Sequence, residues 1–173
     1  MRVREATTTD AEAIAEVHVH SWQSAYRGYL PDHFLDGLSV DRRRRGWMQT
    51  LHDTSWPATG TFVFEDDDRR LLGFAHLSPS RDADAPPLTG EVNSIYLHPE
   101  AWRRGGGRLL IGRAVDRFRQ AGFTSATLWV FDHNLRAQRF YDAMGWQADG
   151  AHKVDTHETL GLTLTEIRYR RDL

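Results

Sequence analysis

The chain has 173 residues, 40% of them hydrophobic, and a formal net charge of −2. This length suits one domain with a sizeable core, and the charge argues against a general binder of nucleic acid or of anionic membranes. The chain has no cysteine, which excludes a disulfide framework and a thiolate nucleophile. It also has no signal-peptide pattern and no apolar stretch near the roughly 20 residues that span a bilayer. We expect a single cytoplasmic domain over residues 1–173 that binds neither nucleic acid nor membranes.

The first half of the chain predicts one strand, three helices and a hairpin. Asp10 precedes a helical pattern in which Ile14 and Val17 face inward, so it is the expected helix cap. We interpret the run Arg42-Arg-Arg-Arg45 as the solvated face of a helix rather than as a nucleic-acid site. The expected elements are a strand at 1–5, a helix at 11–20, an aromatic-rich connection at 21–31, a short helical segment from Pro31, a helix from Asp41 to Leu51, and hairpin strands at 61–65 and 70–77.

The second half predicts four strands and two amphipathic helices. Residues 78–90 contain three prolines, and we expect a surface loop there. The expected elements that follow are a strand at 91–97, a helix at 107–120, a strand at 127–131, a helix at 134–144, and strands at 146–153 and 162–170. This order predicts one α+β domain with a mixed sheet.

A glycine-arginine turn joins the strand at 91–97 to the following helix. It reads Trp102-Arg-Arg-Gly-Gly-Gly-Arg108. Successive glycines let several backbone N–H groups point at one anion, and the start of a helix adds partial positive charge. The arginines of the turn add full charges beside it. The turn therefore predicts a site for a phosphate-bearing cofactor.

Two nucleotide-binding motifs fit this turn poorly. A dinucleotide fingerprint built on Gly105 and Gly107 requires a third glycine at position 110, where the chain has Leu110. A nucleoside-triphosphate loop requires a lysine next to its last glycine, and the only lysine of the chain is Lys153. A different phosphate-bearing cofactor is therefore expected.

The stretch 91–146, about a third of the chain, resembles the GNAT superfamily of acyl-CoA-dependent N-acyltransferases. The turn of that family reads Arg/Gln-x-x-Gly-x-Gly/Ala, which residues 102–107 match except that Trp102 replaces the first Arg or Gln. Downstream, Asn134 followed by Tyr141 resembles the second cofactor segment of the family. The departure at Trp102 removes one polar contact, which Arg103 or Arg104 could replace.

The resemblance implies the GNAT fold and acetyl-CoA as co-substrate. The fold would have a mixed, mostly antiparallel sheet of about seven strands and about four flanking helices. Strands 91–97 and 127–131 would form a central parallel pair that splays apart and grips the pantetheine arm. The cofactor-binding residues implied are Tyr96, Leu97, Arg103, Arg104, Gly105, Gly106, Gly107, Arg108, Asn134 and Tyr141.

The resemblance also implies two catalytic residues. Tyr141 would be the general acid, because a phenol with a pKa near ~10 stays protonated at neutral pH. Its spacing fits equally a residue that packs on the apolar face of its helix. Glu91, eleven residues before Trp102, would be the general base, although an exposed residue at the start of a strand fits as well. His76 is the second candidate for the base.

The acceptor pocket is expected between the first helical region and the loops near the later strands. Its aromatic and acidic residues suit a cationic amine, whereas Arg27 and Arg81 equally suit an acceptor with a carboxylate. Packing in the core remains an alternative for the aromatic residues. The expected substrate-binding residues are Trp22, Tyr26, Arg27, Tyr29, His76 and Arg81, with the segment Lys153 to Glu158 beside them.

No metal site is expected, because the histidines lack metal-ligand spacing. His18 and His20 face different directions on a helix, and His152, His157 and Glu158 lack a third convincing partner. The prediction is therefore an N-acetyltransferase that acts on a primary amine of a small molecule of amino-acid, polyamine or antibiotic type. The alternatives are a non-catalytic acyl-CoA sensor and an enzyme that acetylates protein N-termini or lysines. A homodimer stays open, because the final strand is expected at an edge that could pair.

Overall fold

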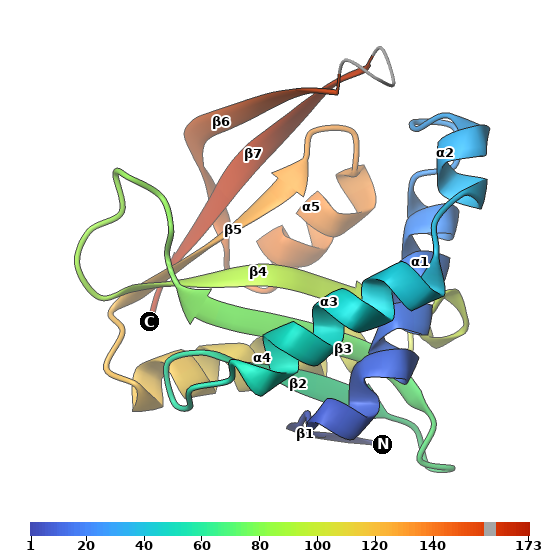
Figure 1. Cartoon of the computed structure of the whole chain (residues 1–173). Helices are drawn as coiled ribbons and strands as arrows, with labels where there is room; N and C mark the ends of the chain where they lie inside the picture. Colours follow the sequence, from blue (N-terminus) through green and yellow to red (C-terminus); the bar gives the residue numbers. More distant parts are fainter. Residues whose placement is uncertain (158–161) are drawn as a thin grey trace.

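The computed structural model describes residues 1–157 and 162–173, and within them seven strands form one sheet with five α-helices around it (Figure 1). Two short 3-10 turns, Thr8–Asp10 and Pro99–Ala101, complete the elements. In chain order the strands and helices are β1 Arg2–Glu5, α1 Ala11–Ala25, α2 Asp32–Asp36, α3 Val40–His52, β2 Gly60–Glu65, β3 Leu71–Pro79, β4 Thr89–Leu97, α4 Gly106–Gln120, β5 Ser125–Phe131, α5 Leu135–Ala143, β6 Gln147–His157 and β7 Leu162–Asp172.

The strand order of the sheet is β1-β2-β3-β4-β5-β7-β6. All neighbours run antiparallel except β4 and β5, which run parallel. Within the described residues, these two strands pair only along Thr89–Val92 and Ser125–Leu128. Beyond that point they separate, and within the described residues the backbone groups that face the gap have no strand partner, while β4 stays paired with β3 and β5 with β7. The predicted fold class, a mixed sheet with a central parallel splayed pair, is confirmed, with five helices where about four were expected.

The two faces of the sheet carry separate cores. Neighbouring side chains on a strand point to opposite faces, so Phe62 and Phe64 of β2 pack on the α4 side while Val63 between them packs beneath α1 and α3. All three are essentially fully buried. Figure 1 shows α1 and α3 on the near face of the sheet, with α4 behind β2. The splayed ends of β4 and β5 therefore have a helical layer on either side.

Two expectations about the elements are wrong. Helix α1 does not end near His20 but continues to Ala25, because the chain has no helix breaker before Gly28 and because Ser21 is buried on the inward face of the helix. The final strand β7 is not an edge, since it lies between β5 and β6. Among the described residues the edge strands are β1 and β6. A sheet order that departs from the chain order leaves no local signal in the sequence.

Candidate functional site

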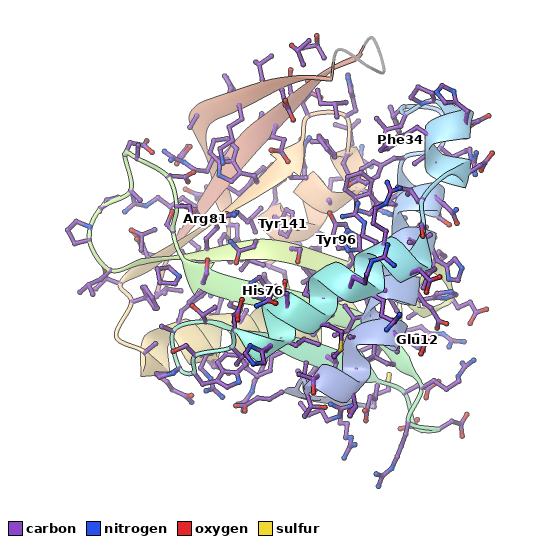
Figure 2. The ribbon with its side chains drawn as sticks, viewed as in Figure 1. Glu12, Phe34, His76, Arg81, Tyr96 and Tyr141 are labelled. Atoms are coloured by element: carbon purple, nitrogen blue, oxygen red, sulfur yellow. The ribbon has the colours of Figure 1, made fainter. Side chains whose placement is uncertain are left out.

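A cavity of about 1180 Å³ lies where β4 and β5 separate. It runs from the first turn of α4, past the open strand ends, to β6 and β7. Figure 2 labels four residues that line it from different parts of the chain: Phe34 on α2, Arg81 before β4, Tyr96 on β4 and Tyr141 on α5. A second cavity of about 370 Å³ lies beside it and shares Tyr26 and Asn134. The splay thus opens the sheet into a binding site.

The glycine turn shapes one end of the large cavity. Gly105 is the N-cap residue of α4, and its φ of +86° favours glycine. A Cβ on Gly106 would lie 2.6 Å from Leu97 Cδ2 and 2.8 Å from Phe64 Cε1, so α4 approaches the sheet closely there. Among the described residues no side chain caps this helix, and its first N–H groups face the cavity end.

Arginines surround this end of the cavity. Arg103 and Arg108 line it, and Arg104 is exposed outside the lining. Within the described part of the chain, none of the three forms an ion pair with a carboxylate. Arg136 of α5 adds a fourth guanidinium, stacked at 3.6 Å from the ring centre of Trp102. The electrostatics of this end therefore favour an anion with several charges.

The backbone of β4 points into the splay at a definite place. The N–H of His98 donates to Leu72 O on the neighbouring strand β3, at 2.8 Å. Because successive N–H groups of a strand point in opposite directions, the N–H of Leu97 points away from β3, toward the gap. The carbonyl of Leu97 accepts a hydrogen bond from Trp102 Nε1 at 2.9 Å. Trp102 thereby fixes the end of β4 against the glycine turn.

Three tyrosines converge in the middle of the cavity. Tyr26, Tyr96 and Tyr141 all line it, and burial raises the pKa of each phenol above its ordinary value. All three are neutral proton donors at neutral pH. The ring centre of Tyr141 also lies 5.8 Å from that of Tyr169. Tyr141 therefore both packs on the apolar face of α5 and lines the cavity.

Glu91 lines the cavity with a side chain that is only 3% exposed. One oxygen accepts from the backbone N–H of Arg81 at 3.0 Å, and the other accepts from its guanidinium at 2.8 Å. The exposed Arg81 therefore covers a buried carboxylate and neutralises it. Any proton transfer to Glu91 from the cavity competes with this ion pair.

Asn134 stands at the junction of the two cavities. Its Oδ1 accepts from the N–H of Ala137 at 3.1 Å, which makes it the N-cap of α5. The Asn134 side chain also hydrogen-bonds to the phenol of Tyr26, which lines both cavities. One residue thus begins the helix that carries Tyr141 and contacts Tyr26 in the site.

The comparisons with known proteins agree on one family. The model of the acetyltransferase (GNAT) family matches residues 17–146. The chain belongs to the GNAT acetyltransferase family. The uncharacterized N-acetyltransferase YuaI of Bacillus subtilis is 32% identical over 167 residues, covering 95% of this chain and 89% of its own length. The protein is accordingly an N-acetyltransferase.

Two solved GNAT structures resemble the whole chain. The GCN5-related N-acetyltransferase from Kribbella flavida has a TM-score of 0.72 at 26% identity and covers 99% of this chain and 97% of its own. The paia N-acetyltransferase from Thermoplasma acidophilum, determined in complex with coenzyme A, has a TM-score of 0.71 at 18% identity, covering 99% and 98%. Both likenesses extend beyond the residues that the family model matches.

The predicted acceptor residues of this GNAT chain do not all meet. Trp22, Tyr26 and Arg81 line the large cavity. Arg27 lies outside, held by Asp32 at 3.0 Å and Asp36 at 2.8 Å, and Tyr29 is 55% exposed and lines only the smaller cavity.

His76, the second candidate for the base, also lies outside the lining. It bonds to Thr61 Oγ1 at 2.9 Å, and burial lowers its pKa to about 4. Of the segment expected beside these residues, Lys153 and Asp155 line the large cavity, and Glu158 lies outside the described residues.

Several residues of the GNAT cavity were not singled out from the sequence. Arg43 belongs to the run interpreted as a solvated helix face, yet it lines the cavity, with its guanidinium 5.4 Å from the ring centre of Trp22. Trp129 and Glu166 face the cavity from β5 and β7. Once β7 is known to lie beside β5, the alternation of side chains predicts both, because Trp129 pairs with Arg168 and Phe131 with Glu166. The sequence shows the alternation of side chains along each strand, but it does not show which strands are neighbours.

No group of three or more His, Cys, Asp or Glu side chains is arranged to hold a metal ion in residues 1–157 and 162–173. In the same part of the chain, no helix is both long and apolar enough to cross a membrane.

Proposed function

We propose that this protein transfers the acetyl group of acetyl-CoA to the primary amine of a small molecule, by direct attack in a ternary complex. The observation that carries the proposal is the single cavity that joins the glycine-arginine turn to a carboxylate-lined end through the open strands β4 and β5. Both substrates can therefore meet beside Tyr141. The absence of cysteine removes the usual thiol carrier of a covalent acetyl intermediate.

The residues present fit the cofactor. The first N–H groups of α4, with Arg103 and Arg108, suit the phosphates. The free edge of β4 suits the amide groups of the pantetheine arm, which would add to the sheet like a short strand. Acetyl-CoA would supply the activated thioester. The chain supplies the groups that bind, orient and protonate around it.

The chemistry assigns one role to each group near the strand gap. The amine nitrogen forms a bond to the acetyl carbon, and the carbon–sulfur bond breaks. At Tyr96 and Leu97, the backbone N–H that points to the gap is that of Leu97, and it would donate to the thioester oxygen; such a donor is worth roughly 3 kcal/mol of transition-state stabilisation. Tyr141 gives its proton to the departing thiolate. Glu91, directly or through a water, takes the proton that the amine loses.

Release of thiol from acetyl-CoA, followed with a chromogenic disulfide reagent, tests the proposal. The protein has no cysteine, so its own background is near zero. A panel of small amines should contain acceptors that drive release. Acetyl-CoA binding without release on any small amine would contradict the proposal and favour a sensor. Release only with peptides would make the enzyme a protein acetyltransferase.

A further inference from the structure

The acceptor end of the cavity contains two charged side chains without an ionic partner. Arg43 on α3 and Glu166 on β7 both line the cavity, and among the described residues neither forms an ion pair or a hydrogen bond. The other charges nearby are engaged. Arg81 is bound to Glu91, and Lys153 contacts Asp82 at 3.2 Å and lies 3.7 Å from the ring centre of Trp129.

The two unpaired charges act on the same hydroxyl group. Arg43, Glu166 and Tyr96 all line this cavity, and the charges of Arg43 and Glu166 act on the pKa of the Tyr96 phenol with opposite signs. Arg43 is fixed over Trp22, and Glu166 lies opposite Lys153 and Phe131 in the sheet. Burial raises the pKa of Glu166, the positive charge of Lys153 lowers it, and the negative charges of Asp155 and Glu91 raise it again. The cavity therefore has a carboxylate on its β7 side and a guanidinium on its α3 side.

We propose that the acceptor is a zwitterion, an amine that carries a carboxylate or a comparable anionic group. Its ammonium lies against Glu166, and its anionic group lies against Arg43. The inference rests on the proposed function and narrows its substrate class. A half-buried charge that lacks a partner is costly, and a ligand of complementary charge removes that cost at both ends at once. Trp22 and Trp129 supply the apolar walls between them.

Matched substrates test the zwitterion. The common L-amino acids and their α-carboxamides, which keep the amine but lose the carboxylate, are compared by thiol release from acetyl-CoA. We expect amino acids to be preferred, with kcat/KM at least about tenfold above that of the matching amide. Arg43→Ala should remove this preference by lowering kcat/KM for the amino acid alone, and Arg43→Lys should restore part of it. Arg42→Ala, an exposed neighbour on the same helix, is the matched control.

Four results separate the inference from the proposed function. Equal rates for acids and amides, or an Arg43→Ala variant that loses both equally, overturn the zwitterion while acetyl transfer stands. Glu166→Gln should raise KM for every amine, and unchanged KM values likewise overturn it. If no small amine is acetylated by the wild type, the proposed function itself fails.

A different observation carries a second inference, at the other end of the cavity. The guanidinium carbon of Arg136 lies over Trp102, 3.6 Å from its ring centre, and Trp102 is the residue that replaces the Arg or Gln of the family motif. Arg136 forms no ion pair among the described residues, and its pKa is lowered by burial and by the neighbouring Arg103. An arginine held against an aromatic ring beside another cation is stabilised by an anion.

We infer that Arg136, held by Trp102, binds a phosphate group of the cofactor in place of the missing first residue of the motif. The ring orients the guanidinium, and the indole N–H fixes the ring to Leu97 O. The charge thus comes from α5 rather than from the glycine turn. The indole of Trp102, which replaces the Arg or Gln of the motif, supports the guanidinium of Arg136.

Calorimetry with coenzyme A, dephospho-coenzyme A and pantetheine tests this second site. Arg136→Ala should weaken coenzyme A by about tenfold and leave pantetheine, which has no phosphoanhydride, unchanged. Loss with coenzyme A alone assigns the contact to the 3′-phosphate, and loss with both phosphorylated ligands assigns it to the pyrophosphate. Trp102→Ala should give the same loss, and the double variant no more. Arg139→Ala, also exposed on α5, is the control. An unchanged affinity in Arg136→Ala, or an equal loss with pantetheine, overturns the inference.

Discussion

The two ends of the cavity are built in different ways. The cofactor end is made mainly of backbone and of residues that follow one another in the chain, from Leu97 through the glycine turn to Arg108. The acceptor end is made of side chains from α1, α3, β5, β6 and β7, which are distant in sequence. A backbone site binds what is common to every reaction of the family. A side-chain site can change its ligand by single substitutions, so specificity belongs to the second end.

Tyr141, at the junction of the two ends, should give the largest effect. Tyr141→Phe should lower kcat by about 100-fold, because the thiolate then leaves without a proton donor. The affinity for both substrates should stay the same, since the ring still fills its place beside Tyr169. Steady-state kinetics measure kcat, and calorimetry measures the affinity for coenzyme A. An unchanged kcat would remove Tyr141 from the chemistry.

A substitution at Gly106 should damage the cofactor end alone. The added methyl group of Gly106→Ala would press on Leu97 and Phe64, and overpacking of this kind costs about 1–3 kcal/mol. The first N–H groups of α4 would shift, so coenzyme A should bind more weakly. Gly112→Ala is the control, because nothing lies within 4 Å of the added atom in the same helix, and it should stabilise by up to about 1 kcal/mol. Equal effects at the two positions would contradict this account of the turn.

Buried histidines on the α1 side of the sheet predict a loss of stability in acid. Burial lowers the pKa of His18, which stacks on Tyr96, to about 3, and that of His76 to about 4. Between about pH 6.5 and 4 only the unfolded chain binds these protons. The free energy of unfolding should therefore fall with falling pH, by at most about 1.4 kcal/mol per pH unit for each group.

Urea denaturation at a series of pH values measures this dependence. His76→Gln keeps a polar partner for Thr61 and removes one titrating group, so its dependence on pH should be shallower than that of the wild type. A slope equal to the wild-type slope would show that His76 is protonated in the folded protein.

The smallest effect is expected at Arg27, and a substitution there tests whether this residue lies outside the acceptor site. Arg27→Ala should leave kcat and KM unchanged, because the side chain is exposed and bound to Asp32 and Asp36 outside the cavity. Arg81→Ala, at the mouth of the cavity, should instead change the pH–rate profile, since it uncovers Glu91. Steady-state kinetics across pH compare the two. Similar profiles for both variants would place the acceptor elsewhere.

Prediction from sequence succeeded where structure is local. The glycine turn, the strand before it and the helix after it follow from neighbouring residues, so the succession of β4, the turn and α4 was predicted correctly. The extension of α1 was missed because the aromatic-rich residues after His20 were interpreted as a connection, although no helix breaker precedes Gly28. Glu166 was missed because its place at the cavity depends on which strands are neighbours, and Arg43 because the place of α3 at the cavity depends on the whole fold. That information is spread over the whole chain and appears only in the folded sheet.

The position of β7 between β5 and β6 also orders events during synthesis. Strands β1 to β4 and helix α4 are complete when the ribosome has made about two thirds of the chain, and they already contain the phosphate turn. The later part of the sheet has a gap until residues 162–172 emerge and insert between two strands made before them. A nascent chain thus has the glycine turn and β4 before it has the strands that carry Trp129, Lys153 and Glu166. The cavity that joins the two ends is complete only after β7 takes its place between β5 and β6.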